Sequence, residues 1–255
     1  NKIIFLKPIY LSLILVVCFV SGERMALAAY SLGLLLLFLF LKENRKIVFL
    51  AMSVGLLSIL TIYKFHPFYS DYKILESNEL HLGLKIEKEF PCKENQNQLC
   101  TKIVDRQPNF FKIIKNFSSS AYGEIYLLSY QMFKDNPITG IGINNFKFLC
   151  NKEIKYKSMM SELNCQAHPH NVYIQWITEG GLIVFFLYLF YLYFLFNLIV
   201  KNNGDKNFKF ISLISVIILI WPIMSTGSLI KNWYGIIFFF TIAISLCLSR
   251  IKKDN

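Results

Sequence analysis

The chain has 255 residues, of which 55% are hydrophobic and 16% aromatic, and its formal net charge is +11. A mean hydropathy of +0.44 excludes an ordinary soluble domain of this size and predicts several membrane helices. No RNA-binding motif of aromatic and basic residues accompanies the charge, so we do not interpret it as a sign of nucleic-acid binding.

The chain begins with Asn1 and enters an apolar run almost at once, so we expect a fragment that lacks N-terminal helices. It has no convincing cleavable signal peptide. Six apolar segments follow, and we expect each to form a membrane helix. Several fall near the lower limit of about 17 to 25 residues for a bilayer span, so their ends are approximate. They cover residues 9–20, 25–41, 47–63, 172–200, 210–224 and 233–249.

Basic residues gather at alternate ends of these segments, as the excess of lysine and arginine in cytoplasmic loops requires. This pattern predicts six spans with both termini in the cytoplasm. Part of the net charge is explained in the same way. The basic residues concerned are Lys2, Lys7, Lys42, Arg45, Lys46, Lys201, Lys206, Lys209, Arg250, Lys252 and Lys253.

The predicted topology divides the chain into three parts. Residues 1–63 form three membrane helices, residues 64–171 form a loop on the periplasmic side, and residues 172–255 form three more helices. We call residues 64–171 the outer segment; it is too long for a simple connection and is expected to fold as a cap or lid. The expected fold class is an all-α polytopic membrane protein with this large loop domain between the third and fourth helices.

The outer segment contains one clear helical pattern, in which Ile125, Leu128 and Met132 recur at helix spacing over about residues 122–134. Pro137 ends this pattern and opens a tight turn.

That turn, over residues 137–142, contains Gly140 and Gly142, which permit backbone angles or close approaches that other residues forbid. A phosphate-binding loop is conceivable there, but a lone Gly-x-Gly favours a tight turn.

The chain has six cysteines. Cys18 and Cys247 lie in apolar segments, where we expect buried, small hydrophobic side chains. The other four lie in the outer segment, on the oxidising side, and therefore predict two disulfides. Three pairings are possible, and proximity in the sequence favours Cys92 with Cys100 and Cys150 with Cys165.

Two histidines stand where the outer segment meets the fourth apolar run. Pro169 restricts His168 to an extended backbone, and Asn171 is a good N-cap for the helix that follows. His170 would then lie beside the positive end of a helix dipole, which favours a neutral imidazole able to take a proton from a hydroxyl. The alternatives are a capping role or a metal site, although two histidines without a third ligand make a weak one.

Arg24 lies between apolar residues and is costly at membrane depth without a partner, so it is a candidate functional residue. Its guanidinium suits a phosphate group, whereas pairing with Glu23 or reaching the headgroups are the alternatives. Glu179, about two turns into the fourth helix, also needs a partner. For Glu179, a structural hydrogen bond to a neighbouring helix competes with a catalytic role.

Three stretches together resemble the signature regions of the O-antigen ligase and Wzy-type polymerase family of bacterial envelope glycosyltransferases. Their order and their placement relative to the outer segment both match, and the resemblance covers the chain from about Ile9, with its core at about 9–200. The stretches are SGERMAL at 21–27, NPITGIGINNF at 136–146 and HPHNVYIQWITEGGLIV at 168–184.

The resemblance implies a GT-C-type enzyme of the bacterial inner membrane, with its active site facing the periplasm. Such enzymes use neither a nucleotide sugar nor an obligatory metal or other cofactor, and they move a glycan from undecaprenyl diphosphate to an acceptor hydroxyl. Arg24 would bind the diphosphate and His170 would orient or deprotonate the hydroxyl. Supporting roles would fall to His168, Asn171, Glu179, Gly140, Gly142 and Gly181.

Two features depart from the family pattern. Members usually have a second arginine before the helix that leads to the glycine turn, where this chain has Tyr122-Gly123-Glu124. Arg106, Lys112 or Lys115 could supply that phosphate contact, or could simply form a charged face of the lid. Val184 stands where a glycine is common, which is expected to alter helix packing and not the chemistry.

The acceptor is not identified by the sequence. A ligase would join O-antigen to lipid A-core, a polymerase would join repeat units, and a protein O-oligosaccharyltransferase would glycosylate a protein. Other classes of function also stay open: a transporter or flippase lined by Arg24 and Glu179, a non-catalytic envelope scaffold, and a metalloenzyme that uses His168 and His170.

Overall fold

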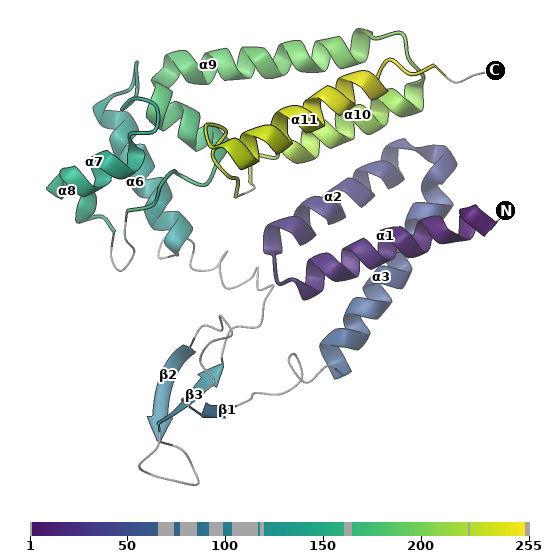
Figure 1. Cartoon of the computed structure of the whole chain (residues 1–255), viewed down its shortest axis with the longest axis horizontal. Coiled ribbons are helices and arrows are strands. Elements are labelled where there is room, and N and C mark those ends of the chain that lie inside the picture. The colour runs from purple at the N-terminus through teal and green to yellow at the C-terminus, as the bar shows by residue number, and fades with distance from the viewer. Residues whose placement is uncertain are drawn as a thin grey trace. The chain divides into compact units, whose positions relative to one another are not determined.

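The computed structural model describes residues 2–65, 74–76, 86–91, 99–103, 117, 120–160, 165–223 and 225–252. Six long helices occupy the six apolar segments (Figure 1). Proline is found inside the first of them, at Pro8, within its first turns. The helices are α1 (Lys2–Val20), α2 (Arg24–Phe40), α3 (Arg45–Phe65), α9 (Val172–Lys201), α10 (Lys206–Leu219) and α11 (Asn232–Leu248), with a short 3-10 turn at Lys42–Asn44.

The chain forms two compact units: residues 1–34 with 43–112, and residues 35–42 with 113–255. In the first unit α1 packs along α3. Leu15 of α1 lies against Gly55 of α3, where an added Cβ would come within 2.8 Å of the leucine Cδ2. The Tyr30 hydroxyl of α2 donates a hydrogen bond to the Leu11 carbonyl at 3.0 Å, which joins α2 to α1.

The first unit also contains a small antiparallel sheet, in the strand order β1-β3-β2. Its strands are β1 (Ile74–Glu76), β2 (Ile86–Pro91) and β3 (Leu99–Ile103), and Thr101 of β3 pairs with Leu75 on one side and Glu89 on the other. The all-α expectation therefore missed a sheet in the outer segment. These strands are three to six residues long and mix charged with apolar residues, so they show no clean alternation.

The second unit joins a set of short outer helices to one end of α9 (Figure 1). The outer helices are α6 (Ala121–Asp135), α7 (Phe146–Lys152) and α8 (Ile154–Lys157). The side chain of Ser120 caps α6 by accepting a hydrogen bond from the amide of Gly123. The helix predicted over about 122–134 is thus present, and Asn136, just before Pro137, is its C-cap.

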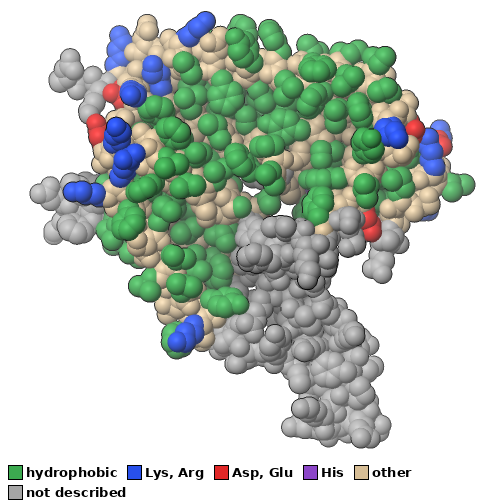
Figure 2. Space-filling view, turned by 180° about the vertical axis from the view of Figure 1, so that it is seen from behind, with side chains coloured by type: hydrophobic (Ala, Val, Ile, Leu, Met, Phe, Trp, Pro, Cys, Tyr) green, Lys and Arg blue, Asp and Glu red, His purple; other side chains and the backbone are tan. Residues whose placement is uncertain are grey.

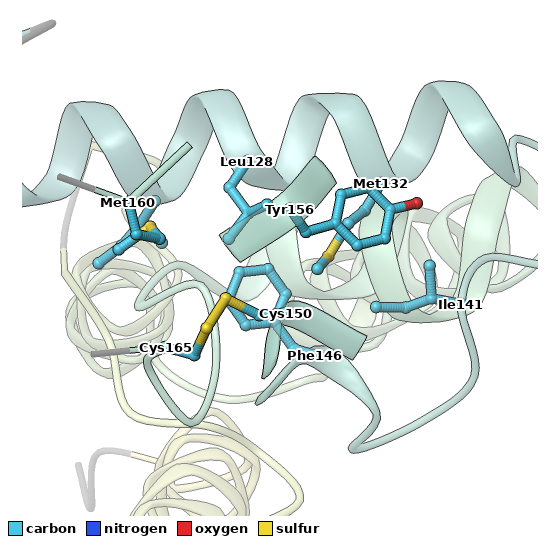
Figure 3. Close-up of a cluster of buried hydrophobic side chains, with 9 residues drawn as sticks. Leu128, Met132, Ile141, Phe146, Cys150, Tyr156, Met160 and Cys165 are labelled. Atoms are coloured by element: carbon cyan, nitrogen blue, oxygen red, sulfur yellow. A yellow bond between two sulfur atoms is a disulfide. The ribbon is translucent and has the colours of Figure 1, made fainter. Parts of the chain in front are cut away.

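A buried apolar cluster holds the outer helices together (Figure 3). Leu128 and Met132 of α6 meet Phe146 and Cys150 of α7 there, and all four side chains are fully buried. The structure contains the expected bridge between Cys150 and Cys165, with their Cα atoms 5.8 Å apart. It ties α7 to the segment that leads into the histidine motif.

The other cysteine predictions have mixed outcomes. Cys92 lies outside the described residues, so its expected pairing with Cys100 stays a prediction. Cys247 is exposed and Cys18 is only half-buried, so the expected burial of these two side chains is wrong. Both lie on helices whose surfaces are apolar, and an apolar surface does not require a partner within the same chain when lipid can cover it.

The helices expose unusually many large apolar side chains. Hydrophobic side chains dominate the face shown in Figure 2, and lysine and arginine side chains occur near its margins. On α9 alone, Phe186, Leu187 and Phe190 are each more than 60% exposed. Two helical stretches, Lys42–Phe65 and Val172–Lys201, are long and apolar enough to cross a bilayer, and Leu6–Val20, Met25–Phe40 and Trp233–Leu248 are shorter apolar helices. This pattern suits a membrane protein; the arrangement of six spans stays a prediction.

Candidate functional site

Helix α9 is broken one third of the way along, and the glycine turn of the outer segment fills the break. At Gly181 the backbone leaves the helical region, with φ 65° and ψ −166°. The carbonyls of Thr178 and Glu179 then lose the amides four residues ahead that an intact helix would give them. They accept instead from the amides of Ile141 and Gly142, at 3.0 and 2.9 Å.

The freed amides beyond the break are satisfied by the same turn. The amide of Leu182 donates to the carbonyl of Pro137 at 2.9 Å, and that of Ile183 donates to Ile138 at 3.3 Å. Two intrahelical hydrogen bonds are thus replaced by four bonds to the turn. The Pro137–Gly142 backbone is therefore an integral part of α9 and is not a free loop.

Close backbone approach explains why two of the glycines are needed. A Cβ on Gly140, whose φ is +66°, would lie 2.5 Å from the carbonyl of Glu179. A Cβ on Gly181 would lie 2.3 Å from the Ile138 oxygen. Neither clash can be relieved by turning a side chain, because both involve backbone atoms. The departure at Val184 is accommodated locally, since its side chain lies over Gly180.

Before the break, α9 carries a buried polar network. The Gln175 Nε2 donates to Glu179 Oε2 at 3.0 Å and to Ser228 Oγ at 2.8 Å. Glu179 is 1% exposed, and its carboxylate faces the backbone amides of Asn144 and Phe146 at the start of α7. The network joins α9 to both neighbouring loops, which favours the structural interpretation of Glu179 over the catalytic one. Gln175 and Ser228 were not identified from the sequence.

The histidine motif is held by the loop before α11. His170 has a positive φ of 56°, which is uncommon for a residue other than glycine. Its carbonyl accepts a hydrogen bond from the amide of Thr226 at 2.7 Å, which fixes this conformation. The rings of His168 and His170 lie 4.3 Å apart between centroids, and the ring of Tyr122 meets His170 edge-on at 6.2 Å.

His168 is nearly buried, at 9% exposure. Its Nε2 lies 3.4 Å from the carbonyl oxygen of Thr226, which suits the tautomer with a proton on Nε2. Among the described residues, no group hydrogen-bonds to its buried Nδ1. A second proton on this ring would therefore be buried without an acceptor.

Asn171 caps α9 as the sequence predicts. Its side-chain oxygen accepts from the amides of Tyr173 and Ile174, at 3.0 and 3.2 Å. Its amide nitrogen also donates to the carbonyl of Pro222 at 2.7 Å, so the cap ties α9 to the end of α10. The sequence signals the cap, but the second contact depends on tertiary packing and has no local signal.

Both imidazoles are kept neutral, chiefly by burial. Burial, the neighbouring His170 and the charge of Lys231 lower the pKa of His168 to about 4. Burial and Lys231 also lower the pKa of His170. The pKa of His170 is lowered, as expected, but burial and not the helix dipole is the main cause. A neutral His170 at physiological pH can accept a proton from a hydroxyl.

The remaining predicted site residues are placed only in part. Arg24 is the first residue of α2 and belongs to the other compact unit, so its proximity to His170 stays a prediction. Arg106, Lys112 and Lys115 lie outside the described residues. Within the described ranges, no three His, Cys, Asp or Glu side chains gather where a metal ion could bind.

The exposed apolar helices, together with a broken helix whose backbone groups are all paired by an inserted turn, suit a membrane protein. The family model described as O-antigen ligase matches residues 9–189, so the chain belongs to the O-antigen ligase family, and the resemblance of the signature regions is confirmed. The family is of the ligase and polymerase type. Comparison with curated proteins and with solved structures gave no match.

Replacing Gly181 by alanine should unfold the joint between the turn and α9. The new Cβ would meet the Ile138 carbonyl while the residue is held in the left-handed region, so we expect a loss of at least about 2 kcal/mol of stability. Thermal unfolding of the full-length protein in detergent measures this loss of stability. Gly55→Ala is the matched control, because the nearest atom there is the end of a flexible leucine side chain. Equal melting temperatures for the two variants would contradict the arrangement.

His168 should make the folded protein sensitive to acid. Because its pKa is about 4 in the folded chain and about 6.5 when unfolded, only the unfolded chain takes up this proton between those values. The contribution of His168 to the free energy of unfolding is complete above pH 6.5. It is lost as the pH falls toward 4, by up to about 3 kcal/mol. Unfolding measured from pH 7 to 4 should show a shallower loss for His168→Gln than for the wild type. Parallel curves would refute this assignment.

Proposed function

We propose that the chain is the catalytic part of an inner-membrane glycosyltransferase that acts on the periplasmic side. It transfers a glycan from undecaprenyl diphosphate to an acceptor hydroxyl, and the acceptor is lipid A-core, as in an O-antigen ligase. The observation that carries the proposal is the fixed, neutral and half-buried His170 directly before the N-cap of α9, in a chain of this family.

In the proposed reaction the acceptor oxygen attacks the anomeric carbon as the bond from that carbon to the diphosphate breaks. The hydroxyl proton passes to His170, and the undecaprenyl diphosphate leaves with the bonding electron pair. No free acid is needed to drive the step, since the diphosphate is a good leaving group. The protein has mainly to orient the two substrates and to balance charge.

The groups around His170 support this role. Thr226 fixes its backbone, and the neighbouring rings of His168 and Tyr122 limit where the imidazole can turn. Lys231 disfavours a protonated imidazole before reaction, and so keeps the base available. Arg24 is proposed to bind the diphosphate, as its place in the SGERMAL signature suggests.

The proposal predicts the lipopolysaccharide pattern of a strain in which the full-length gene is the only copy. His170→Ala and Arg24→Ala should each abolish attachment of long glycans, so that free lipid A-core accumulates while the glycan stays on its carrier. Gel banding measures this at matched protein levels. Lys157→Gln, an exposed lysine on α8, is the control and should leave the wild-type ladder.

Two other lipopolysaccharide patterns would reject parts of the proposal. Single repeats attached in place of a ladder would reject the ligase and identify a polymerase of the same family. A wild-type ladder in both His170→Ala and Arg24→Ala would reject the catalytic role of the motif and leave His170 with a structural one.

A further inference from the structure

An open pocket of about 680 Å³ lies beside the histidine motif and has no part in the chemistry described above. Its walls come from α7, from the turn before α7, from the segment before His168 and from the N-cap residue of α11. The described residues that line it are Asn144, Lys147, Phe148, Asn151, Lys152, Ala167 and Lys231.

The pocket is strongly cationic. Lys147, Lys152 and Lys231 line it, and no acidic residue does among the described lining. Within the described part of the chain none of the three forms an ion pair, whereas nearby Lys155 pairs with Asp135 at 2.9 Å. Three ammonium groups around one hollow repel one another, and a bound anion would relieve that repulsion.

The walls are fixed relative to each other. Lys147 and Lys152 lie on the exposed side of α7, while Phe146 and Cys150 of the same helix are fully buried in the apolar cluster of Figure 3. The bridge from Cys150 to Cys165 then holds α7 against the segment that contains Ala167. The backbone that carries Lys147, Lys152 and Ala167 is therefore fixed before a ligand binds, so that only the lysine side chains have to become ordered around it.

The pocket adjoins the proposed acceptor side of the reaction. Lys231 lines it and is close enough to both imidazoles to lower their pKa values. The side-chain amides of Asn144 and Asn151 can donate to and accept from sugar hydroxyls. The ring of Phe148 is exposed, and the ammonium group of Lys152 lies over one of its faces, 5.6 Å from the ring centroid, which leaves the other face for a sugar ring.

We propose that this pocket binds an anionic group, phosphate or carboxylate, on the acceptor glycan, and so selects acidic acceptors. The inference rests on the proposed function, in which His170 acts on the acceptor hydroxyl and Arg24 on the donor diphosphate. Lys147 and Lys152 are the residues assigned to the anion, and Lys231 joins the pocket to the histidines.

The test compares the full-length wild type with the double variant Lys147→Gln/Lys152→Gln. Lys231 is left intact because its charge also acts on His170. Transfer is measured on phosphorylated lipid A-core and on the same acceptor after phosphatase treatment. The double variant should raise KM for the phosphorylated acceptor by about tenfold or more, with kcat and the donor KM unchanged. On the dephosphorylated acceptor the two proteins should be alike, and Lys157→Gln should match the wild type throughout.

Three results would overturn the inference: an increase in the donor KM, equal losses on both acceptors, or no change. Direct binding of both acceptors to the same purified proteins separates this inference from the proposed function. If the wild type transfers nothing but still binds phosphorylated acceptor through the two lysines, the function fails and the pocket assignment stands. If transfer depends on His170 but the double variant binds phosphorylated acceptor as well as the wild type does, the proposed function stands and the pocket assignment fails.

Discussion

The hydrogen bonds between the Pro137–Gly142 turn and the broken helix α9 are the constraint on which the rest of the second unit depends. An apolar helix cannot leave its backbone groups unpaired at membrane depth, because no water is available to satisfy them. Here the turn supplies two donors and two acceptors to the break at Gly181. The arrangement is possible only because Gly140 and Gly181 let the two backbones approach to a distance that a Cβ would prevent.

This joint has consequences on both sides. The turn is anchored to α6 and α7, so the break in α9 fixes the outer helices and the lysine pocket relative to the N-terminal part of α9. That part begins at Asn171, whose cap and contact to Pro222 bring the loop before α11 against the histidines. A second connection between α9 and the loop before α11 is buried. It consists of the hydrogen bonds from Gln175 to Glu179 and to Ser228. The position of His170 therefore follows from backbone pairing more than from its own side-chain contacts.

The sequence predicted well what depends on neighbouring residues. The six apolar helices, the α6 pattern, the Asn171 cap and the Cys150–Cys165 pair all have local signals. It missed what depends on long-range pairing: the sheet of β1, β2 and β3, the break at Gly181, and Gln175, Ser228 and Lys231 as neighbours of the motif. The lowered pKa of His170 was expected from a helix dipole, but burial is its first cause and the charge of Lys231, from the loop before α11, is the second. Periodicity cannot report contacts of that kind.

Hydrogen–deuterium exchange of the full-length protein in detergent tests the central claim most directly. If the turn is built into α9, peptides that cover residues 138–142 and 181–184 should exchange slowly and together, as slowly as those of α6. Their protection should also be lost together in Gly181→Ala. Exchange of residues 138–142 within seconds, as in an unbonded surface loop, while α9 stays protected would contradict the account.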